Sequence, residues 1–187
     1  QITDTEENGF AYLSGDIVEQ GLADAITLII DWGDGEQEQV NVAAGSQHFE
    51  LSHRYLDDAQ YAVSVTAADE LTAGATLATT VTVINLAPTI ESIGVDQSVI
   101  DENGSITLVG SISDAGSLDS HSVSIDWGDG NTETVLDDPE SREFSVTHQY
   151  LDDSPSDGFV ITATVSDDDG AHSGTATTGV VVNNRAP

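Results

Sequence analysis

The pentapeptide Asp-Trp-Gly-Asp-Gly occurs twice in this chain of 187 residues, at positions 31–35 and 126–130. Apolar residues at every second position lead into each copy, a period that predicts a β-strand with one buried face. Trp32 and Trp127 are in phase with these apolar residues, so we expect both indoles to point into a core. Asp31 and Asp126 are out of phase and are expected to face water or a neighbouring strand. The apolar residues are Ile26, Leu28 and Ile30 before the first copy, and Val123 and Ile125 before the second.

The Gly-Asp-Gly that ends each motif predicts a tight hairpin turn. Glycine adopts a positive φ without strain, and an aspartate side chain accepts hydrogen bonds from its own backbone. We therefore interpret the motif as the folding centre of a β-domain that is present twice in the chain.

Other landmarks repeat with the same spacing. The sequence His-x-Tyr-Leu-Asp-Asp occurs at 53–58 and at 148–153, and Glu-Asn-Gly occurs at 7–9 and at 102–104, in both cases 95 residues apart. Asn-x-Ala-Pro occurs at 85–88 and at 184–187, which is an offset of 99. The chain is therefore predicted to hold two homologous domains, residues 1–86 and 87–187, each close to the ~100 residues of an immunoglobulin-like sandwich.

Alternating apolar positions predict about seven short strands in each domain, separated by turns rich in Gly, Asp, Asn and Ser. No segment shows the 3.6-residue period of a helix. The predicted fold class is all-β, as two tandem immunoglobulin-like antiparallel β-sandwiches. A fragment of a first strand is expected within residues 1–9, and the other predicted strands of the first domain are 11–17, 26–32, 36–42, 49–55, 61–67 and 77–83.

The charge of the chain is extreme, with 34 acidic residues, three arginines, no lysine and a formal net charge of −31. Because like charges repel, nucleic acid and anionic membranes are excluded as partners. The 38% of apolar residues argues against disorder. Two explanations remain open, a surface adapted to salty water and the binding of divalent cations. Cysteine is absent, which excludes disulfide and thiol chemistry.

The motif set resembles the polycystic kidney disease (PKD) repeat. Trp-Gly-Asp-Gly, His-x-Tyr, the acidic run Asp-Asp-Asp-Gly at 167–170 and the exit Asn-x-Ala-Pro carry this resemblance over nearly the whole chain. One departure is that the family usually has Trp-Asp-Phe-Gly-Asp-Gly, whereas the tryptophan here comes two residues later, which keeps its inward phase. The resemblance is strongest to the acidic repeats of very large bacterial surface proteins. It implies an extracellular or cell-surface location, and the chain reads as part of a longer string of repeats.

Acidic loops predict a calcium site at one end of the second domain. In an immunoglobulin-like sandwich the loop after the second strand, the loop before the last strand and the chain entry lie at the same end. Several nearby carboxylates repel one another, and a hard cation removes that repulsion. Calcium takes six to eight oxygen ligands, whereas magnesium demands stricter geometry and zinc prefers His or Cys. The predicted ligands are Asp114, Asp119, Asp167, Asp168 and Asp169, with Asn85 from the preceding linker.

The first domain has a poorer version of this site, formed by Glu19, Asp24, Asp69 and Glu70. The alternative for both domains is that these loops are solvated turns. If calcium binds beside the linker at 85–88, we expect it to stiffen the connection between the domains, since Pro88 already restricts it. The acidic pairs at 57–58 and 152–153 are expected to be ordinary turns, with a second cation site as the alternative.

The histidines do not predict catalysis. His53 and His148 are in phase with apolar neighbours and are expected to be half-buried structural residues, whereas His48, His121 and His172 match no repeat position and are expected at the surface. Asp31 and Asp34 could form a glycosidase pair, but they lie on a hairpin without an evident cleft. No nucleophile elbow, phosphate loop or zinc spacing is present, so no enzymatic activity is predicted.

Phe10 and Tyr12 are out of phase with Ala11 and Leu13 and are expected to face outward, where the second domain has Ser105 and Thr107. Exposed aromatic residues can mark a binding face for polysaccharide or protein. The alternative is that they pack under the N-terminal segment. The sequence thus favours a monomeric, non-catalytic spacer that contacts neighbouring repeats, with an adhesion module that binds a partner directly as the alternative.

Overall fold

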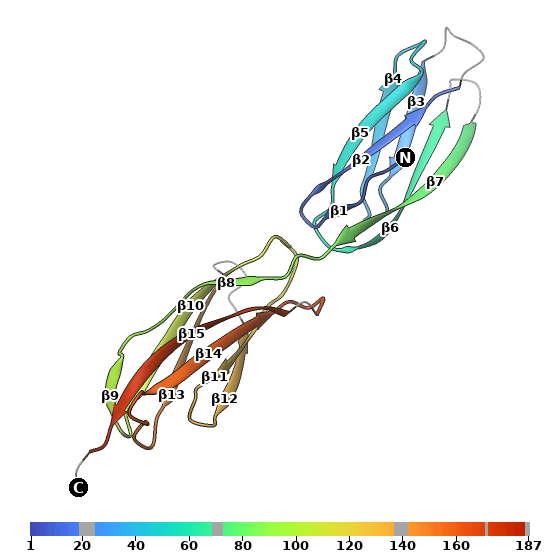
Figure 1. The fold of residues 1–187 in the computed structure, drawn as a ribbon. Helices are drawn as coiled ribbons and strands as arrows, with labels where there is room; N and C mark the ends of the chain where they lie inside the picture. The colour runs from blue at the N-terminus through green and yellow to red at the C-terminus, as the bar shows by residue number, and fades with distance from the viewer. Residues whose placement is uncertain (19–24, 69–72, 137–141, 171, 186–187) are drawn as a thin grey trace. The chain divides into compact units, whose positions relative to one another are not determined.

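The computed structural model describes residues 1–18, 25–68, 73–136, 142–170 and 172–185, and all of its regular elements in these ranges are β-strands. The chain divides into two compact units, Gln1–Asn85 (unit 1) and Leu86–Pro187 (unit 2). Each unit is a sandwich of two sheets, as the ribbon in Figure 1 shows for each unit separately. No helix long and apolar enough to cross a membrane occurs in the part of the chain that the structure describes.

Unit 1 packs a sheet of order β1-β7-β6-β3-β4 against the two-stranded sheet β2-β5. The parallel pairing of β1 with β7 is the exception in an otherwise antiparallel unit. The strands are β1 (Thr5–Glu6), β2 (Phe10–Asp16), β3 (Ile26–Asp31), β4 (Gln37–Val42), β5 (His48–Arg54), β6 (Ala59–Ala68) and β7 (Ala73–Ile84).

Unit 2 repeats this arrangement and adds one strand. Its sheets have the orders β12-β11-β14-β15-β9 and β13-β10-β8, so that β8 occupies an edge beside β10. The strands are β8 (Thr89–Val95), β9 (Val99–Asp101), β10 (Ser105–Ser113), β11 (Ser122–Asp126), β12 (Thr132–Leu136), β13 (Glu143–Gln149), β14 (Phe159–Ser166) and β15 (His172–Asn183).

The alternating sequence pattern accounts for the core of each sandwich. In β3 the apolar residues Ile26, Leu28 and Ile30 are buried, and Trp32, at the end of the same face, is 1% exposed. Trp127 has the same place and the same exposure after β11. The predicted inward phase of both tryptophans is confirmed, as is the all-β class with two tandem immunoglobulin-like sandwiches.

Candidate metal centre

The two aspartates of each Asp-Trp-Gly-Asp-Gly motif organise the hairpin turn. In unit 1, Asp31 Oδ1 accepts a hydrogen bond from the backbone N–H of Gly33 at 3.0 Å, and Asp34 Oδ1 accepts one from Glu36 at 3.0 Å. In unit 2, Asp126 and Asp129 accept the matching bonds at 2.9 and 3.0 Å. Both glycines of each motif have a positive φ. The predicted turn is therefore confirmed in both units.

The second aspartate of each motif also makes a contact that the sequence analysis did not predict. His53 Nε2 donates to Asp34 Oδ2 at 2.6 Å, and the imidazole stacks on Trp32 with ring centroids 4.7 Å apart. Tyr55 packs edge-on against His53 and donates its hydroxyl proton to the Trp32 carbonyl at 2.8 Å. One Trp–His–Tyr–Asp cluster thus ties the turn to the opposite sheet. Its four side chains recur in unit 2 as Trp127, Asp129, His148 and Tyr150.

These clusters have electrostatic consequences. Burial and the neighbouring carboxylate of Asp34 raise the pKa of Tyr55, and burial and Asp129 raise the pKa of Tyr150. For Asp129, burial alone would raise the pKa, but hydrogen bonds from His148 and Asn131 outweigh it and lower the pKa. Asp and His are separated by 19 residues in both repeats, but every matched pair shares such an equal separation, so the sequence carried no specific signal for this contact.

The acidic loops of unit 2 bring three of the predicted calcium ligands together. One carboxylate oxygen from each of Asp119, Asp168 and Asp169 lies within 4.8 Å of the other two. Asp119 is 6% exposed, whereas Asp168 and Asp169 are exposed. Asp168 Oδ1 accepts the backbone N–H of Ser120 at 3.0 Å, and this bond lowers the pKa of Asp168. Asp167 is also buried.

Asp114 lies in a different environment, a buried cluster with His121 and Arg142. His121 Nε2 donates to Asp114 Oδ2 at 2.5 Å, and neither side chain is exposed to solvent. The Arg142 guanidinium contacts His121 Nδ1 and donates to the carbonyls of Asp119 at 3.2 Å and Gly116 at 3.1 Å. Because arginine only donates, Nδ1 must accept, which assigns the imidazole proton to Nε2. The prediction that His121 is a surface residue was wrong, because these two charged groups hold it inside the loop.

The donor set of the acidic loops decides which cation could fit. Asp114, Asp119 and His121 also offer atoms within 4.8 Å of one another, but both nitrogens of His121 are already engaged and Arg142 places a positive charge beside them. The trio Asp119, Asp168 and Asp169 offers only carboxylate oxygens, which suit calcium and leave the remaining positions to backbone carbonyls or water. This all-oxygen trio is the candidate metal centre.

The remaining predicted ligands stay predictions. Glu19, Asp24, Asp69 and Glu70 lie outside the described residues, and Asn85 is the last residue of unit 1. At the acidic pairs 57–58 and 152–153, the first aspartate accepts a hydrogen bond from the backbone N–H of the second, at 3.1 Å for Asp57 and 3.0 Å for Asp152. Such a bond is common in ordinary turns. Oxygens of Glu102, Asp152 and Asp153 nevertheless lie within 4.8 Å of one another.

Phe10 and Tyr12 lie on the outer face of the β2-β5 sheet. Each residue is 53% exposed, and their cross-strand neighbours are Arg54 and Ser52. Tyr12 contacts the N-terminal segment through its backbone N–H, which donates to Thr3 Oγ1 at 2.9 Å. The N-terminal segment therefore leaves about half of each aromatic residue open to solvent.

No protein-family model matches the sequence. A comparison with curated proteins also finds no match. Among solved structures, the two-domain fibronectin type III segment of chicken tenascin covers 97% of this chain and 96% of its own length, with 14% identity and a TM-score of 0.55.

Two further structures are similar at lower TM-scores. The PKD domain of an M14-like peptidase from a Thermoplasmatales archaeon matches 53% of this chain and 98% of its own, with 21% identity and a TM-score of 0.45. The full ectodomain (Ig1–Ig3) of mouse nectin-like molecule 4 matches 100% of this chain and 64% of its own, with 17% identity and a TM-score of 0.41. At such identities the tenascin match shows the fold alone, a tandem pair of immunoglobulin-like β-sandwiches.

Proposed function

We propose that the chain is a non-catalytic spacer of the PKD type from a large extracellular bacterial repeat protein, and that its acidic loops bind calcium. One observation supports the spacer function above others. The aspartate and the histidine that hold each turn to the opposite sheet recur in both units, as Asp34 and His53 in unit 1 and as their counterparts in unit 2. What is repeated along this chain is thus a device for stability. A string of such stable units is suited to a spacer, which holds other parts of a protein at a set distance.

The calcium part of the proposal is supported by the close approach of Asp119, Asp168 and Asp169. Three carboxylates at this separation repel one another, by about 1 kcal/mol per pair in water and by several at a lower effective dielectric. A divalent cation bound among the three carboxylates replaces this repulsion with attraction. Arg142, which donates to the Asp119 backbone carbonyl, lies close by and weakens the affinity for a cation.

Thermal unfolding across a calcium titration tests this part directly. A site that exists only in the folded state must raise the unfolding midpoint as calcium increases. The ionic strength is held constant with magnesium or sodium chloride, so that general screening is subtracted. The variant Asp168→Asn with Asp169→Asn should lose the calcium response, because an amide keeps the side-chain acceptor but removes the charge. If calcium raises the midpoint no more than magnesium does, the calcium part fails.

A matched control removes the same charge elsewhere. Glu36 and Glu38 are exposed residues on the hairpin of unit 1, far along the chain from the acidic loops of unit 2. Glu36→Gln with Glu38→Gln should keep the full calcium response. Loss of the response in both double variants would show that it depends on total charge.

We further propose that calcium stiffens the connection at residues 85–88. The linker leads directly into β8, whose first residue, Thr89, pairs with Ser113, the residue before Asp114. The entry of unit 2 thus lies beside the acidic loop that follows β10. Small-angle scattering in calcium and in chelator tests this stiffening. We expect a longer maximum dimension and a narrower range of conformations in calcium. An unchanged maximum dimension would count against stiffening while leaving calcium binding intact.

Adhesion is the second candidate function, and the exposure of Phe10 and Tyr12 favours it. Aromatic side chains on an open sheet face suit stacking on sugars or packing against a protein. The discriminating experiment replaces both aromatic residues by their counterparts in unit 2, in the double variant Phe10→Ser with Tyr12→Thr. Binding to a glycan array or to extracellular matrix proteins that this variant abolishes would favour adhesion. Absence of binding by the unaltered protein would leave the spacer function.

A further inference from the structure

The loop between β10 and β11, residues 114–121, brings Asp119 to the candidate metal centre. Asp119 is 6% exposed, so its side chain lies inside the loop and not at its surface. A side chain keeps such a place when the backbone around it is fixed by further contacts. Arg142, the residue before β13, supplies two contacts of this kind from another segment of unit 2.

The Arg142 guanidinium holds Asp119 at two points. Nη1 donates to the Asp119 carbonyl oxygen at 3.2 Å, and Nη2 donates to the Gly116 carbonyl oxygen at 3.1 Å. Gly116 lies directly against the Asp119 carboxyl group, since a Cβ on this glycine would be within 2.5 Å of the carboxyl atoms. The arginine therefore fixes the backbone of Asp119 and also the residue against which its carboxyl group packs.

Asp114 and His121 hold the guanidinium in turn. Arg142 contacts His121 Nδ1, and His121 Nε2 donates to Asp114 Oδ2 at 2.5 Å, with both side chains fully buried. The planar guanidinium binds the imidazole and the two carbonyls through a rigid fork, a geometry that the single nitrogen of lysine does not copy. The carboxyl group of Asp114 also offsets the positive charge that Arg142 brings close to the cation site.

The backbone of Arg142 shows that its place is constrained. Its φ is 56°, and the other non-glycine residues with a positive φ in the described ranges are the asparagines Asn8 and Asn103. Asparagine enters this region more easily than other residues, whereas arginine does so at a cost. Such a conformation persists where the surrounding contacts determine it. For Arg142 these contacts are made with the loop at 114–121.

Unit 1 has the matching position without the arginine. The Arg142 carbonyl accepts the backbone N–H of Ile112 at 2.9 Å, and the Gln47 carbonyl accepts that of Ile17 at 3.0 Å. Both residues of the second pair come 95 positions before their counterparts in the first. Gln47, which is exposed, therefore takes the place of Arg142 in unit 1.

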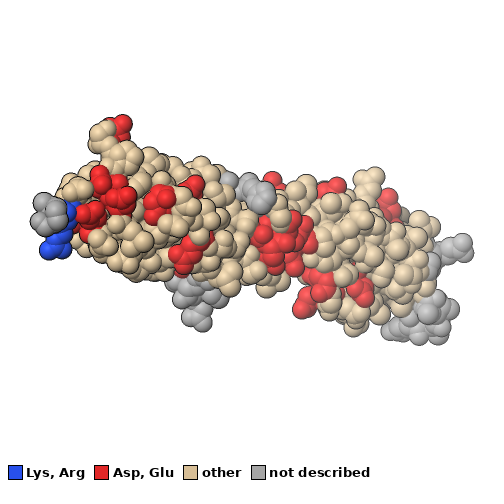
Figure 2. Space-filling model, turned by 90° about the horizontal axis from the view of Figure 1, so that it is seen from below, with Lys and Arg blue, Asp and Glu red and all other residues tan. Residues whose placement is uncertain are grey.

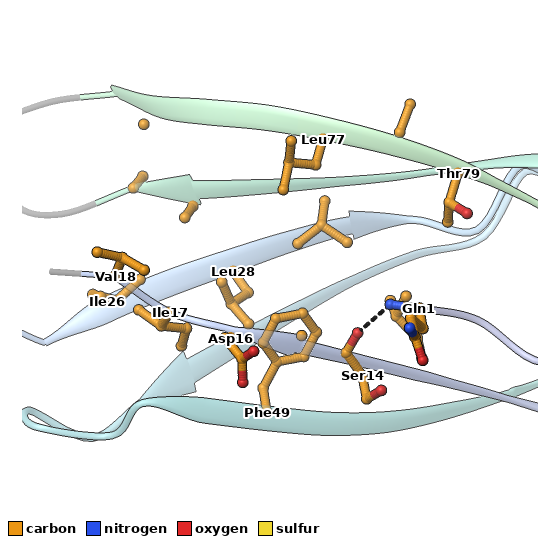
Figure 3. Close-up of a pocket in the computed structure, with 17 residues that line it drawn as sticks. Gln1, Ser14, Asp16, Ile17, Val18, Ile26, Leu28, Phe49, Leu77 and Thr79 are labelled. Carbon is orange, nitrogen blue, oxygen red and sulfur yellow. Dashed lines mark hydrogen bonds between the residues drawn. The ribbon is translucent and has the colours of Figure 1, made fainter.

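The place of His121 is taken by Ile26, again 95 positions earlier. Ile26 is 8% exposed and lines a largely apolar pocket of unit 1 together with Ile17 and Leu28 (Figure 3). An aliphatic side chain at this position cannot accept a hydrogen bond from a guanidinium. Because unit 1 forms its sandwich with isoleucine and glutamine at the two positions, the fold itself does not require the histidine and arginine of unit 2.

We propose that Arg142 is the positioning residue of the candidate metal centre. Through the carbonyls of Gly116 and Asp119 it keeps the loop closed before any cation binds, so that the Asp119 carboxylate already lies beside Asp168 and Asp169. A cation then meets a preformed set of oxygens, and its binding has to order fewer residues. The inference rests on the proposed calcium binding for its ligand, whereas the ordering of the loop can be measured without calcium.

Amide hydrogen exchange in chelator tests the ordering of the loop. The Ser120 N–H donates to Asp168 Oδ1 at 3.0 Å and so reports on the contact between the two acidic loops. Arg142→Gln, which introduces the residue of unit 1, should speed exchange of this amide by about tenfold or more, because the loop opens locally. Amides at the centre of β11 and β14 should keep their rates, since the sandwich stays intact. An unchanged rate at Ser120 would overturn the proposal.

Calcium affinity separates positioning from charge. The charge of Arg142 opposes a cation, so its removal alone should strengthen calcium binding, whereas loss of positioning should weaken it. We expect Arg142→Gln to weaken calcium binding by about 10–100-fold in competition with a chromophoric chelator. Arg142→Lys keeps the charge but loses the planar fork, and it should weaken binding as well. Stronger binding by Arg142→Gln than by the unaltered protein would overturn the proposal.

A matched control removes the same charge elsewhere in unit 2. Arg185 is exposed and follows the end of β15, and Arg185→Gln should change the calcium affinity by less than about twofold, because solvent and salt screen its charge. If the unaltered protein does not bind calcium, the calcium part of the proposed function fails, and the exchange rate of Ser120 in chelator alone decides whether Arg142 orders the loop. If that rate rises in Arg142→Gln while calcium binds as tightly as before, Arg142 does not position the metal centre and the proposal is wrong.

Discussion

Each turn aspartate has two oxygens with different tasks. Oδ1 of Asp129 accepts a hydrogen bond from the Asn131 backbone N–H at 3.0 Å and so shapes the turn, and Oδ2 accepts a hydrogen bond from His148 Nε2 at 2.9 Å. The turn and the opposite sheet are therefore coupled through one carboxyl group. Asparagine at this position would still shape the turn, but it would bring no charge to the contact with His148.

Asp129→Asn should weaken unit 2 in a pH-dependent way. The folded state lowers the pKa of Asp129, so the unfolded state binds more protons near the ordinary pKa of about 3.9. The stabilisation is therefore complete above that pH and is lost as the pH falls through the folded-state pKa. We expect a loss of about 1.5 kcal/mol in the free energy of unfolding at pH 6, and a smaller loss at pH 3, below the ordinary pKa. Urea unfolding of the variant and the unaltered protein at both pH values measures it.

The control for this prediction is Glu133→Gln, which removes one negative charge from an exposed position on β12. It accounts for the general change in repulsion when the net charge becomes less negative. If the stability difference between Asp129→Asn and Glu133→Gln stays the same from pH 6 to pH 3, the contact with His148 does not stabilise the charged form.

Single residues were predictable where a local pattern decides their place. The inward phase of Trp32 and Trp127 follows from the period of the strand before each of them. The burial of His121 does not, because it depends on Asp114, 7 residues away at the start of the same loop, and on Arg142, 21 residues away in another segment. Alternation says which face a side chain takes, but it cannot report a charged partner that a distant loop supplies.

At the scale of the element, the hairpin turn of the motif places unequal demands on its two glycines. Both Gly128 and Gly130 have a positive φ, which an L-residue adopts at a cost. A Cβ on Gly128 would also lie 2.5 Å from the Val160 carbonyl oxygen, whereas a Cβ on Gly130 meets nothing within 4 Å. The first glycine is thus required for the close approach of β14, and the second for the turn conformation alone.

Alanine substitution at the two positions separates these effects. Gly130→Ala should cost about 1 kcal/mol in the free energy of unfolding, from the strained φ. Gly128→Ala should cost a further 1–3 kcal/mol, because the turn must move away from β14. Denaturant unfolding of both variants provides the measurement. Equal costs would mean that the backbone of β14 yields easily at Val160.

Most elements of the fold could be predicted, because strand period and turn chemistry act over a few residues. The hairpin of β3 and β4 and the positions of most strands along unit 1 are examples. The candidate metal centre was predicted less completely. Asp119, Asp168 and Asp169 meet as expected, but Asp114 is held by His121 instead. Which nearby partner a loop side chain contacts depends on the three-dimensional arrangement of the loops. The spacing of residues along the sequence does not specify that arrangement.

At the scale of the whole molecule, the surface charge is the dominant feature. Figure 2 shows acidic side chains spread over the face in view of both units, with basic side chains at one end only. A net charge of −31 keeps molecules apart in solution, but it also opposes the compact state, since folding brings these charges closer together.

Monovalent salt should therefore stabilise this protein. Screening also weakens the attractive contacts, such as the exposed pair Asp16–His48, but three arginines against 34 acidic residues leave repulsion as the larger quantity. The screening length falls from about 10 Å at 0.1 M salt to about 3 Å at 1 M. We expect the unfolding midpoint to rise steadily over this range and to be the same in sodium and potassium chloride, because screening does not distinguish the two ions.

This dependence has a different shape from calcium binding. Screening acts gradually over hundreds of millimolar, whereas a bound calcium ion gives a response that grows with the logarithm of its concentration above the dissociation constant. The two should also differ in the Asp168→Asn, Asp169→Asn double variant, which removes the candidate centre but only two of 34 acidic charges. That variant should keep nearly all of its response to sodium chloride. If the unfolding midpoint does not change with monovalent salt, repulsion among the carboxylates does not limit the stability of the folded state. Local contacts would then already offset the negative charges.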